Sequence, residues 1–188
     1  AKLVMLGSSE AGKSSIVNRL IRDTFSENIT ATIGTAFFSK TLQVQNKNVK
    51  LQIWDTSGSE RYRALTPMYF QHADAAIIVY DITSPQSFYE VESWVKTLKE
   101  YGPEKIVVGL AGNKIDLNAT RAVDVSAGKS CAEKYDIPVF METSAKTGEN
   151  VLKIFTDIVN CLLNSDQPQN KPTSALISEN QEKKSDCC

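Results

Sequence analysis

The sequence predicts a single α/β domain with a six-stranded, mostly parallel sheet, one antiparallel edge strand and helices on both faces. Short β-branched and apolar runs alternate along the chain with segments that repeat apolar residues at helical spacing. Strands separated by helices imply right-handed crossovers and parallel pairing. The runs at 2–6, 75–80 and 106–111 are nearly all apolar, as strands covered on both faces are.

The strands are set by these runs and by one hairpin signal. Polar and apolar residues alternate on both sides of Gln45 to Asn48, which predicts a hairpin and so the antiparallel edge. The expected strands span residues 2–6, 37–44, 49–55, 75–80, 106–111 and 139–142.

Three helices follow the helical period most clearly. One begins near Lys13 and runs through Ile21, a second covers 88–98, and a third covers 151–163. After Leu163 the chain becomes rich in Pro, Gln, Asn, Ser and Lys. We therefore expect residues 1–163 to form the domain and 164–188 to be a disordered tail.

Composition excludes several classes of protein. The chain is 41% hydrophobic and 23% charged, with a net charge of −1, so neither general disorder nor bulk attraction to nucleic acid is expected. No apolar run is long enough to span a membrane, and Ala1 to Gly7 is too short for a signal peptide, although a segment missing before Ala1 is expected. Cys131 and Cys161 are expected to be small buried hydrophobes in a reduced, cytosolic protein.

The first chemical motif is a phosphate-binding loop. Residues 7–14 satisfy G-x-x-x-x-G-K-[ST] between a strand and a helix. Backbone N–H groups there can surround phosphate oxygens, and the helix N-terminus favours negative charge. Lys13 adds a positive charge for the β- and γ-phosphates, and Ser14 adds a hydroxyl suited to magnesium. The alternative is a chance glycine turn.

The segment from Asn113 to Asp116 is predicted to select guanine because it follows a phosphate loop, whereas alone it would fit a solvated turn equally well. The Asp116 carboxylate accepts hydrogen bonds and suits the two donors on one edge of guanine, whereas adenine places an acceptor there. Lys114 can cover the base plane with its aliphatic stem. Ser144, Ala145 and Lys146 are placed to close the other side with backbone N–H groups. An ATP-dependent kinase or transporter subunit is disfavoured for this reason.

Two further segments are candidates for sensing the third phosphate. Asp55 ends a strand and is expected to hold magnesium through water, and Gly58 allows close approach to the γ-phosphate. Thr32 lies in a polar stretch predicted to be strandless, 26–35. A threonine hydroxyl that reaches the metal only when GTP is bound would make this stretch an order–disorder switch. By itself, Thr32 reads as an ordinary loop residue.

Together these motifs resemble the Ras superfamily of small GTPases, and within it the Rab family. The ending Cys187-Cys188 is also Rab-like, and two stretches look most like the early-endosomal subgroup. Those two stretches are 66–70 and 141–146, and the general Rab-like stretches are 33–37, 50–54, 61–65 and 80–83.

The resemblance implies a GTPase that converts GTP and water to GDP and phosphate with Mg²⁺, and recruits effectors in vesicular transport. Phe25 would stack on guanine, and Phe37, Trp54 and Tyr69 would form an effector surface rather than core. Cys187 and Cys188 would carry geranylgeranyl groups, and two lipid chains anchor stably where one does not. The implied nucleotide-contacting residues are Glu10, Ala11, Gly12, Lys13, Ser14, Ser15, Phe25, Thr32, Gly58, Asn113, Lys114, Asp116, Ser144, Ala145 and Lys146.

The resemblance also implies partners and a location. The expected partners are a guanine-nucleotide exchange factor, a GTPase-activating protein, a GDP-dissociation inhibitor or escort protein, and effectors. A monomer is expected, without a nucleic-acid partner. The expected location is the cytoplasmic face of membranes, at the early endosome, in exchange with the cytosol.

Ser59 departs from the family pattern, which has a water-orienting glutamine two residues before Arg61. Serine lacks the amide, so slow intrinsic hydrolysis is expected, with Lys13 and Thr32 as the other catalytic candidates. The alternatives are a non-hydrolysing pseudo-GTPase scaffold, or a substitute group that leaves hydrolysis normal. Glu10 and Ala11 also depart from the pattern, and the Glu10 side chain must point outward if nucleotide is to bind.

Overall fold

The computed structural model of the chain describes residues 1–27, 32–58 and 66–165. Its six-stranded sheet has the order β2-β3-β1-β4-β5-β6, in which the β2–β3 pair is antiparallel and the other pairs are parallel. The predicted fold class is thus confirmed. The strands are β1 (Lys2–Leu6), β2 (Thr35–Val44), β3 (Lys47–Thr56), β4 (Ala75–Asp81), β5 (Val107–Asn113) and β6 (Val139–Thr143).

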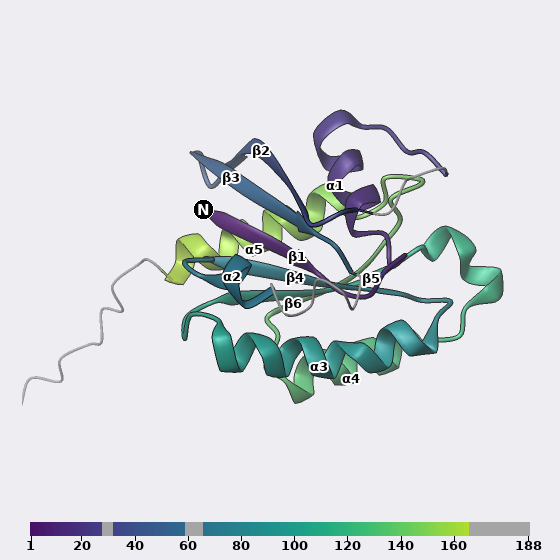
Figure 1. Cartoon of the computed structure of the whole chain (residues 1–188). Coiled ribbons are helices and arrows are strands. Elements are labelled where there is room, and N and C mark those ends of the chain that lie inside the picture. The colour runs from purple at the N-terminus through teal and green to yellow at the C-terminus, as the bar shows by residue number, and fades with distance from the viewer. Residues whose placement is uncertain (28–31, 59–65, 166–188) are drawn as a thin grey trace, which may run out of the picture.

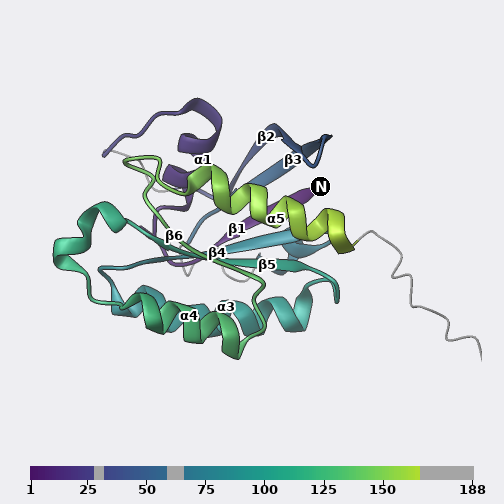
Figure 2. The ribbon, with the colours of Figure 1, turned by 180° about the vertical axis from the view of Figure 1, so that it is seen from behind.

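Helices cover both faces of the sheet. α1 and α5 pack on one face, and α3 and α4 pack on the other (Figures 1 and 2). Each face has its own apolar cluster, and the nearly all-apolar β4 contributes alternate residues to both. The helices are α1 (Lys13–Arg22), α2 (Thr66–Phe70), α3 (Pro85–Tyr101), the 3₁₀ helix η2 (Ile115–Thr120), α4 (Val125–Lys134) and α5 (Val151–Ser165).

Element ends differ from the expectations where turn chemistry decides them. The hairpin loop contains only Gln45 and Asn46, both with positive φ (50° and 59°), because a two-residue turn of this kind matches the twist of the strands. β3 therefore begins at Lys47, inside the segment predicted as the loop. β2 begins at Thr35, the last residue of the stretch predicted to be strandless, because it pairs with Thr56.

The C-terminal helix continues slightly beyond its apolar period. α5 ends at Ser165, so Asn164 and Ser165 are helical. The rest of the predicted tail, with Cys187 and Cys188, lies outside the described residues, and its disorder stays a prediction. Cys131 and Cys161 are half-buried rather than fully buried, and burial raises the pKa of both thiols. No helix in the described ranges combines the length and apolarity that crossing a bilayer requires.

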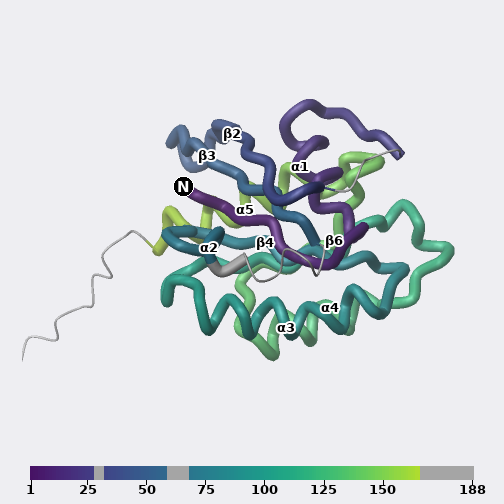
Figure 3. Tube along the Cα trace, viewed as in Figure 1, coloured from purple at the N-terminus to yellow at the C-terminus, as the bar shows by residue number. Residues whose placement is uncertain are grey.

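The parallel strands bring their carboxyl ends to one edge. The chain leaves β1, β5 and β6 at that edge (Figure 3), so the segments predicted to bind phosphate and guanine become neighbours.

Candidate nucleotide-binding site

The phosphate loop between β1 and α1 depends on two glycines with positive φ. Gly7 has φ of 128°, and a Cβ there would lie 2.1 Å from the Val79 carbonyl oxygen. Gly12 has φ of 94°, and a Cβ there would lie 2.2 Å from Asn113 Nδ2. Both positions require glycine, because L side chains rarely adopt this backbone and have no room here. Glu10 is exposed, as the sequence analysis required for nucleotide binding.

Lys13 folds back over the loop that precedes it. Its Nζ donates to the carbonyl oxygens of Gly7 (2.8 Å) and Ser8 (2.7 Å), and the residue is only 5% exposed. Burial lowers the pKa of Lys13 to about 8, although the charges of Asp55 and Glu90 oppose the shift. A buried ammonium whose acceptors here are two neutral carbonyl oxygens is suited to bind an anion, which is a stronger acceptor.

Three oxygen-bearing side chains converge beside Lys13. The hydroxyls of Ser14 and Thr32 are 2.8 Å apart. Asp55 is buried and its Oδ1 has no hydrogen-bond partner in the described part of the chain. Burial raises the pKa of this carboxyl, against the opposing effects of the Ser14 hydroxyl and the Lys13 charge. The cluster is therefore an oxygen-rich site with one buried acceptor unused.

These oxygens fit a magnesium ion. Neighbouring ligands of octahedral Mg²⁺, each about 2.1 Å from the metal, are about 3.0 Å apart, close to the 2.8 Å between the Ser14 and Thr32 hydroxyls. The unused Asp55 oxygen supplies negative charge beside them. Within the described ranges no group of three or more His, Cys, Asp or Glu residues is arranged to hold a metal.

The segment after β3 lies directly on the phosphate loop. A Cβ at Gly58 would lie 2.4 Å from the Ser9 nitrogen and 2.5 Å from Lys13 Nζ. The Ser57 N–H also donates to the Gly34 carbonyl oxygen at 2.8 Å. The candidate sensor segments around Thr32 and Gly58 are thus joined to each other and to the phosphate loop.

Asn113 connects the phosphate loop to the segment after β6. Its Nδ2 donates to the Ala11 carbonyl oxygen at 3.0 Å. Its Oδ1 accepts hydrogen bonds from Thr143 Oγ1 (3.2 Å) and from the Ala145 N–H (3.3 Å). The Asn113 side chain therefore connects the phosphate loop, the segment 113–116 and the segment after β6.

The guanine-reading side chains are held by neighbours. Asp116 Oδ1 accepts a hydrogen bond from Ser144 Oγ at 2.6 Å, and Ser144 Oγ accepts one from the Thr147 N–H at 3.0 Å. Lys114 has φ of 73°, and its Nζ lies 2.7 Å from Asp81 Oδ2 at the end of β4. This ion pair fixes the position of the Lys114 ammonium group.

Comparison with known proteins identifies the family. Residues 2–164 match the model of the Ras family. The chain belongs to the Ras family. It is 44% identical to Ras-related protein Rab-5A of Dictyostelium discoideum over 100% of this chain and 94% of the relative. It is 43% identical to human Ras-related protein Rab-22A over 100% and 97%, and 49% identical to GTP-binding protein ypt5 of Schizosaccharomyces pombe over 84% and 75%.

These relatives confirm the resemblance to endosomal-type Rab proteins, and members of the Ras family are GTPases that bind guanine nucleotides. The three aromatic residues of the predicted effector surface are neighbours in this Ras-family chain. The ring centroids of Phe37 and Trp54 are 5.5 Å apart, and those of Trp54 and Tyr69 are 6.5 Å apart. Phe37 is 54% exposed, and the other two are partly buried.

The remaining predicted residues lie at the margins of the Ras-family site. Phe25 is exposed in the segment after α1, and Lys146 Nζ lies 3.1 Å from Glu27 Oε1. Ser15 is half-buried in the first turn of α1. Ser59 lies outside the described residues.

Several contacts of the site escaped the sequence analysis. They are the Lys114–Asp81 pair, a hydrogen bond from Ser8 Oγ to Glu90 Oε2 (2.8 Å), and hydrogen bonds from Arg19 to the segment after β6. Asp81 could have been identified from the sequence as a candidate site residue, because it ends a buried strand at the ligand-binding edge. Glu90 and Arg19 lie inside helices and carry no local signal.

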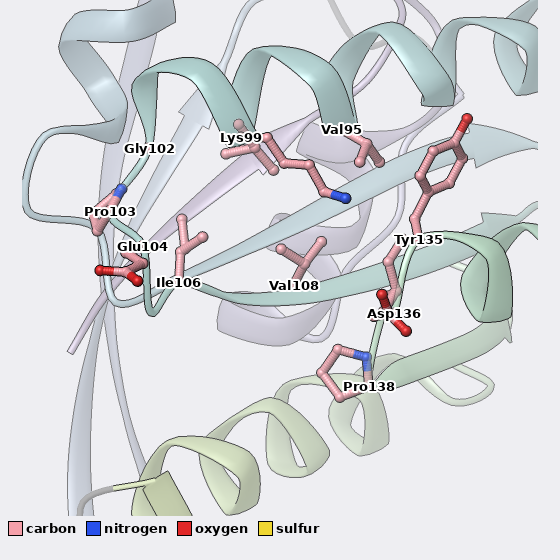
Figure 4. Close-up of a pocket in the computed structure, with 12 residues that line it drawn as sticks. Val95, Lys99, Gly102, Pro103, Glu104, Ile106, Val108, Tyr135, Asp136 and Pro138 are labelled. Atoms are coloured by element: carbon pink, nitrogen blue, oxygen red, sulfur yellow. The ribbon is translucent and has the colours of Figure 1, made fainter.

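A separate hollow lies away from these residues. It has a volume of about 280 Å³ and lies among the end of α3, the start of β5 and the segment before β6 (Figure 4). Val95, Ile106 and Val108 form apolar walls, with Lys99 and Tyr135 beside them. It contains none of the predicted site residues.

Proposed function

We propose that this Ras-family chain is a Rab-type GTP/GDP switch that recruits effectors to endosomal membranes and hydrolyses GTP slowly on its own. The observation that carries the proposal is the Asn113 network. Its hydrogen bonds of 3.0–3.3 Å join the phosphate loop to the guanine-reading segments, so one ligand with phosphates and a purine can span them.

The phosphates would be bound by the backbone N–H groups of residues 10–15 and by Lys13. Lys13 would exchange its two carbonyl acceptors for phosphate oxygens, which are stronger partners for a buried ammonium. Ser14 and Thr32 would ligate Mg²⁺, and Asp55 would hold it through water. The metal would neutralise charge on the phosphates. Thr32 then favours the GTP-bound order of its segment, as a switch requires.

Guanine would lie between Lys114 and Phe25. Asp116 would accept from the two donors of the base, with Ser144 keeping the carboxylate in place. The backbone N–H group of Lys146 would face the 6-oxo group, because the Ala145 N–H donates to Asn113 Oδ1. ATP is disfavoured, because adenine presents an acceptor where the Asp116 carboxylate needs a donor.

Slow hydrolysis rests on Ser59. Phosphoryl transfer depends on positioning the attacking water and on stabilising charge, and a serine has neither the reach nor the amide of glutamine. Hydrolysis stimulated by an activating protein is expected to survive where that protein donates its own arginine and glutamine.

A single-turnover assay with Mg·GTP-loaded protein tests this proposal. We expect slow wild-type hydrolysis, and a faster rate for Ser59→Gln because the amide can orient water. A wild-type rate like that of ordinary small GTPases would contradict the role given to Ser59. GDP and GTP affinities should be the same in both proteins, which controls for effects on binding.

Ser59 also favours a second candidate function. A pseudo-GTPase scaffold would hold GTP without turnover. No hydrolysis in the wild type, in Ser59→Gln or with an activating protein would select the scaffold. Stimulated hydrolysis would select the switch.

Membrane attachment is proposed through lipids on Cys187 and Cys188, with effectors binding at Phe37, Trp54 and Tyr69. Exchange factors, activating proteins and a GDP-dissociation inhibitor are the proposed regulators. The endosomal location rests on similarity to Rab-5A and Rab-22A. Mass spectrometry of protein from cells should find two geranylgeranyl groups, and Cys187→Ser with Cys188→Ser should move the protein from membrane to cytosol.

A further inference from the structure

Arg19 of α1 reaches across to the loop that is proposed to read guanine. Its Nε donates to the Ala145 carbonyl oxygen at 2.9 Å, and one Nη donates to the Lys146 carbonyl oxygen at 2.7 Å. The other Nη donates to the Asp23 carbonyl oxygen and carboxylate, both at 2.9 Å. The planar guanidinium thus joins the loop of residues 144–147, here called the base loop, to the end of α1.

This contact is well supported by its surroundings. The Arg19 side chain is only 16% exposed. A Cβ placed on Gly148 would lie 3.5 Å from Arg19 Cδ, so the aliphatic stem packs against the end of the base loop. Hydrogen bonds to charged groups in partly buried positions contribute more than ordinary surface pairs.

The bonds also set the direction of the loop's N–H groups. A trans peptide unit is planar, with its carbonyl oxygen and its N–H on opposite sides. Because Arg19 holds the Ala145 carbonyl toward α1, the Lys146 N–H in the same peptide unit faces the other way. The next N–H, that of Thr147, is already bound to Ser144 Oγ. Arg19 therefore leaves the Lys146 N–H directed away from the helix.

We propose that Arg19 is a positioning residue that orients the base loop toward the 6-oxo group of guanine and slows nucleotide release. The proposal rests on the proposed assignment of the base loop to guanine. It also links two parts of the site, because α1 begins at Lys13 of the phosphate loop and ends near Phe25.

The test compares Arg19→Ala with the matched control Arg22→Ala, an exposed arginine in the last turn of the same helix. Affinities and release rates are measured with Mg·GDP and Mg·6-thio-GDP, whose sulfur is a weak acceptor. Arg19→Ala should weaken GDP binding and speed its release about tenfold, as expected for lost charge-assisted hydrogen bonds. Binding of 6-thio-GDP should weaken much less, so the wild-type preference for GDP should shrink. Arg22→Ala should match the wild type.

Arg19→Lys keeps the charge but lacks the fork, and should restore only part of the preference. Wild-type release and preference in Arg19→Ala, or equal loss for both nucleotides, would overturn the proposal, because equal loss indicates only structural support. If Arg19→Ala does not fold by circular dichroism, Arg19→Lys decides: a full wild-type preference overturns the proposal. A wild type that binds GDP tightly without preferring it to 6-thio-GDP overturns this inference alone, and one that does not bind GDP overturns the proposed function as well.

Discussion

Single polar side chains, rather than long runs of contacts, hold the candidate site together. Asn113 is 1% exposed and bonds to Ala11 on one side and to Thr143 and Ala145 on the other, and Ala11 lies far from the other two in sequence. Buried amides are costly to leave unpaired, so these bonds fix both the side chain and the loops that it meets. Asp116 has a similar but simpler anchor in Ser144.

Asp116→Asn should change which base the protein prefers. An asparagine amide places a donor where the carboxylate had only acceptors, so it no longer matches guanine but suits the extra carbonyl of xanthine. We expect GDP affinity to fall by roughly 100-fold or more, with a relative gain for xanthosine diphosphate. Competition binding with both nucleotides measures the change. The control is the substitution by asparagine of Asp157, which is half-buried on α5 and pairs with Lys153 away from the base loop. Unchanged GDP affinity in Asp116→Asn would contradict the assigned role.

At this scale the sequence predicted the motif residues but not their partners. The phosphate loop and residues 113–116 have fixed local spacing, which a sequence displays directly. Arg19 contacts Ala145 across 126 positions and Ser8 contacts Glu90 across 82, and both pairings depend on how helices pack. No local pattern encodes such contacts.

Among the elements, α4 was the least visible in the sequence because little of it is apolar. Only Gly128 and Ala132 are buried in it. A Cβ at Gly128 would lie 2.5 Å from the Tyr80 hydroxyl oxygen and 2.6 Å from Phe140 Cζ. Because Gly128 has no side chain, α4 can pack closely against the sheet. Close packing of this kind leaves no apolar stripe for a periodicity argument to detect.

Gly128→Ala should destabilise the protein despite the higher helix propensity of alanine. The propensity gain is about 1 kcal/mol, whereas overpacking against buried rings costs about 1–3 kcal/mol. We expect a net loss in the free energy of unfolding, measured by urea titration of the nucleotide-free protein. Ser130→Ala, at an exposed position of α4, should be neutral or slightly stabilising. A Gly128→Ala protein as stable as Ser130→Ala would show that α4 can move outward without cost.

For the whole molecule, the mostly parallel sheet with one antiparallel edge strand and helices on both faces was predictable, and the electrostatics of the site were not. Apolar strands alternating with helices leave few topologies, and the hairpin signal fixed the single antiparallel edge. The burial of Lys13 and Asp55, by contrast, emerges only when several loops come together. Removing the Lys13 ammonium and the Asp55 carboxylate from water costs free energy that their mutual attraction offsets only in part, since burial is the largest cause of both pKa shifts.

Mg·GDP should therefore raise the stability of the whole domain. A ligand at about 100 times its dissociation constant adds about 2.7 kcal/mol to the free energy of unfolding. Thermal melts with Mg·GDP, and after removal of both by chelation and phosphatase, measure the difference. Mg·ADP serves as the control and should leave the melting temperature unchanged. An equal rise with ADP would contradict guanine selectivity.

The direction of α5 gives the molecule a polarity. The helix starts beside the base loop and runs back along the sheet, so Ser165 lies at the far end from the phosphate loop (Figures 1 and 2). Fifteen residues at about 1.5 Å each place these ends about 22 Å apart along the helix. A lipid tether beyond Ser165 would join the domain at the end opposite the nucleotide site. Regulatory proteins could then reach the bound nucleotide without displacing the membrane anchor.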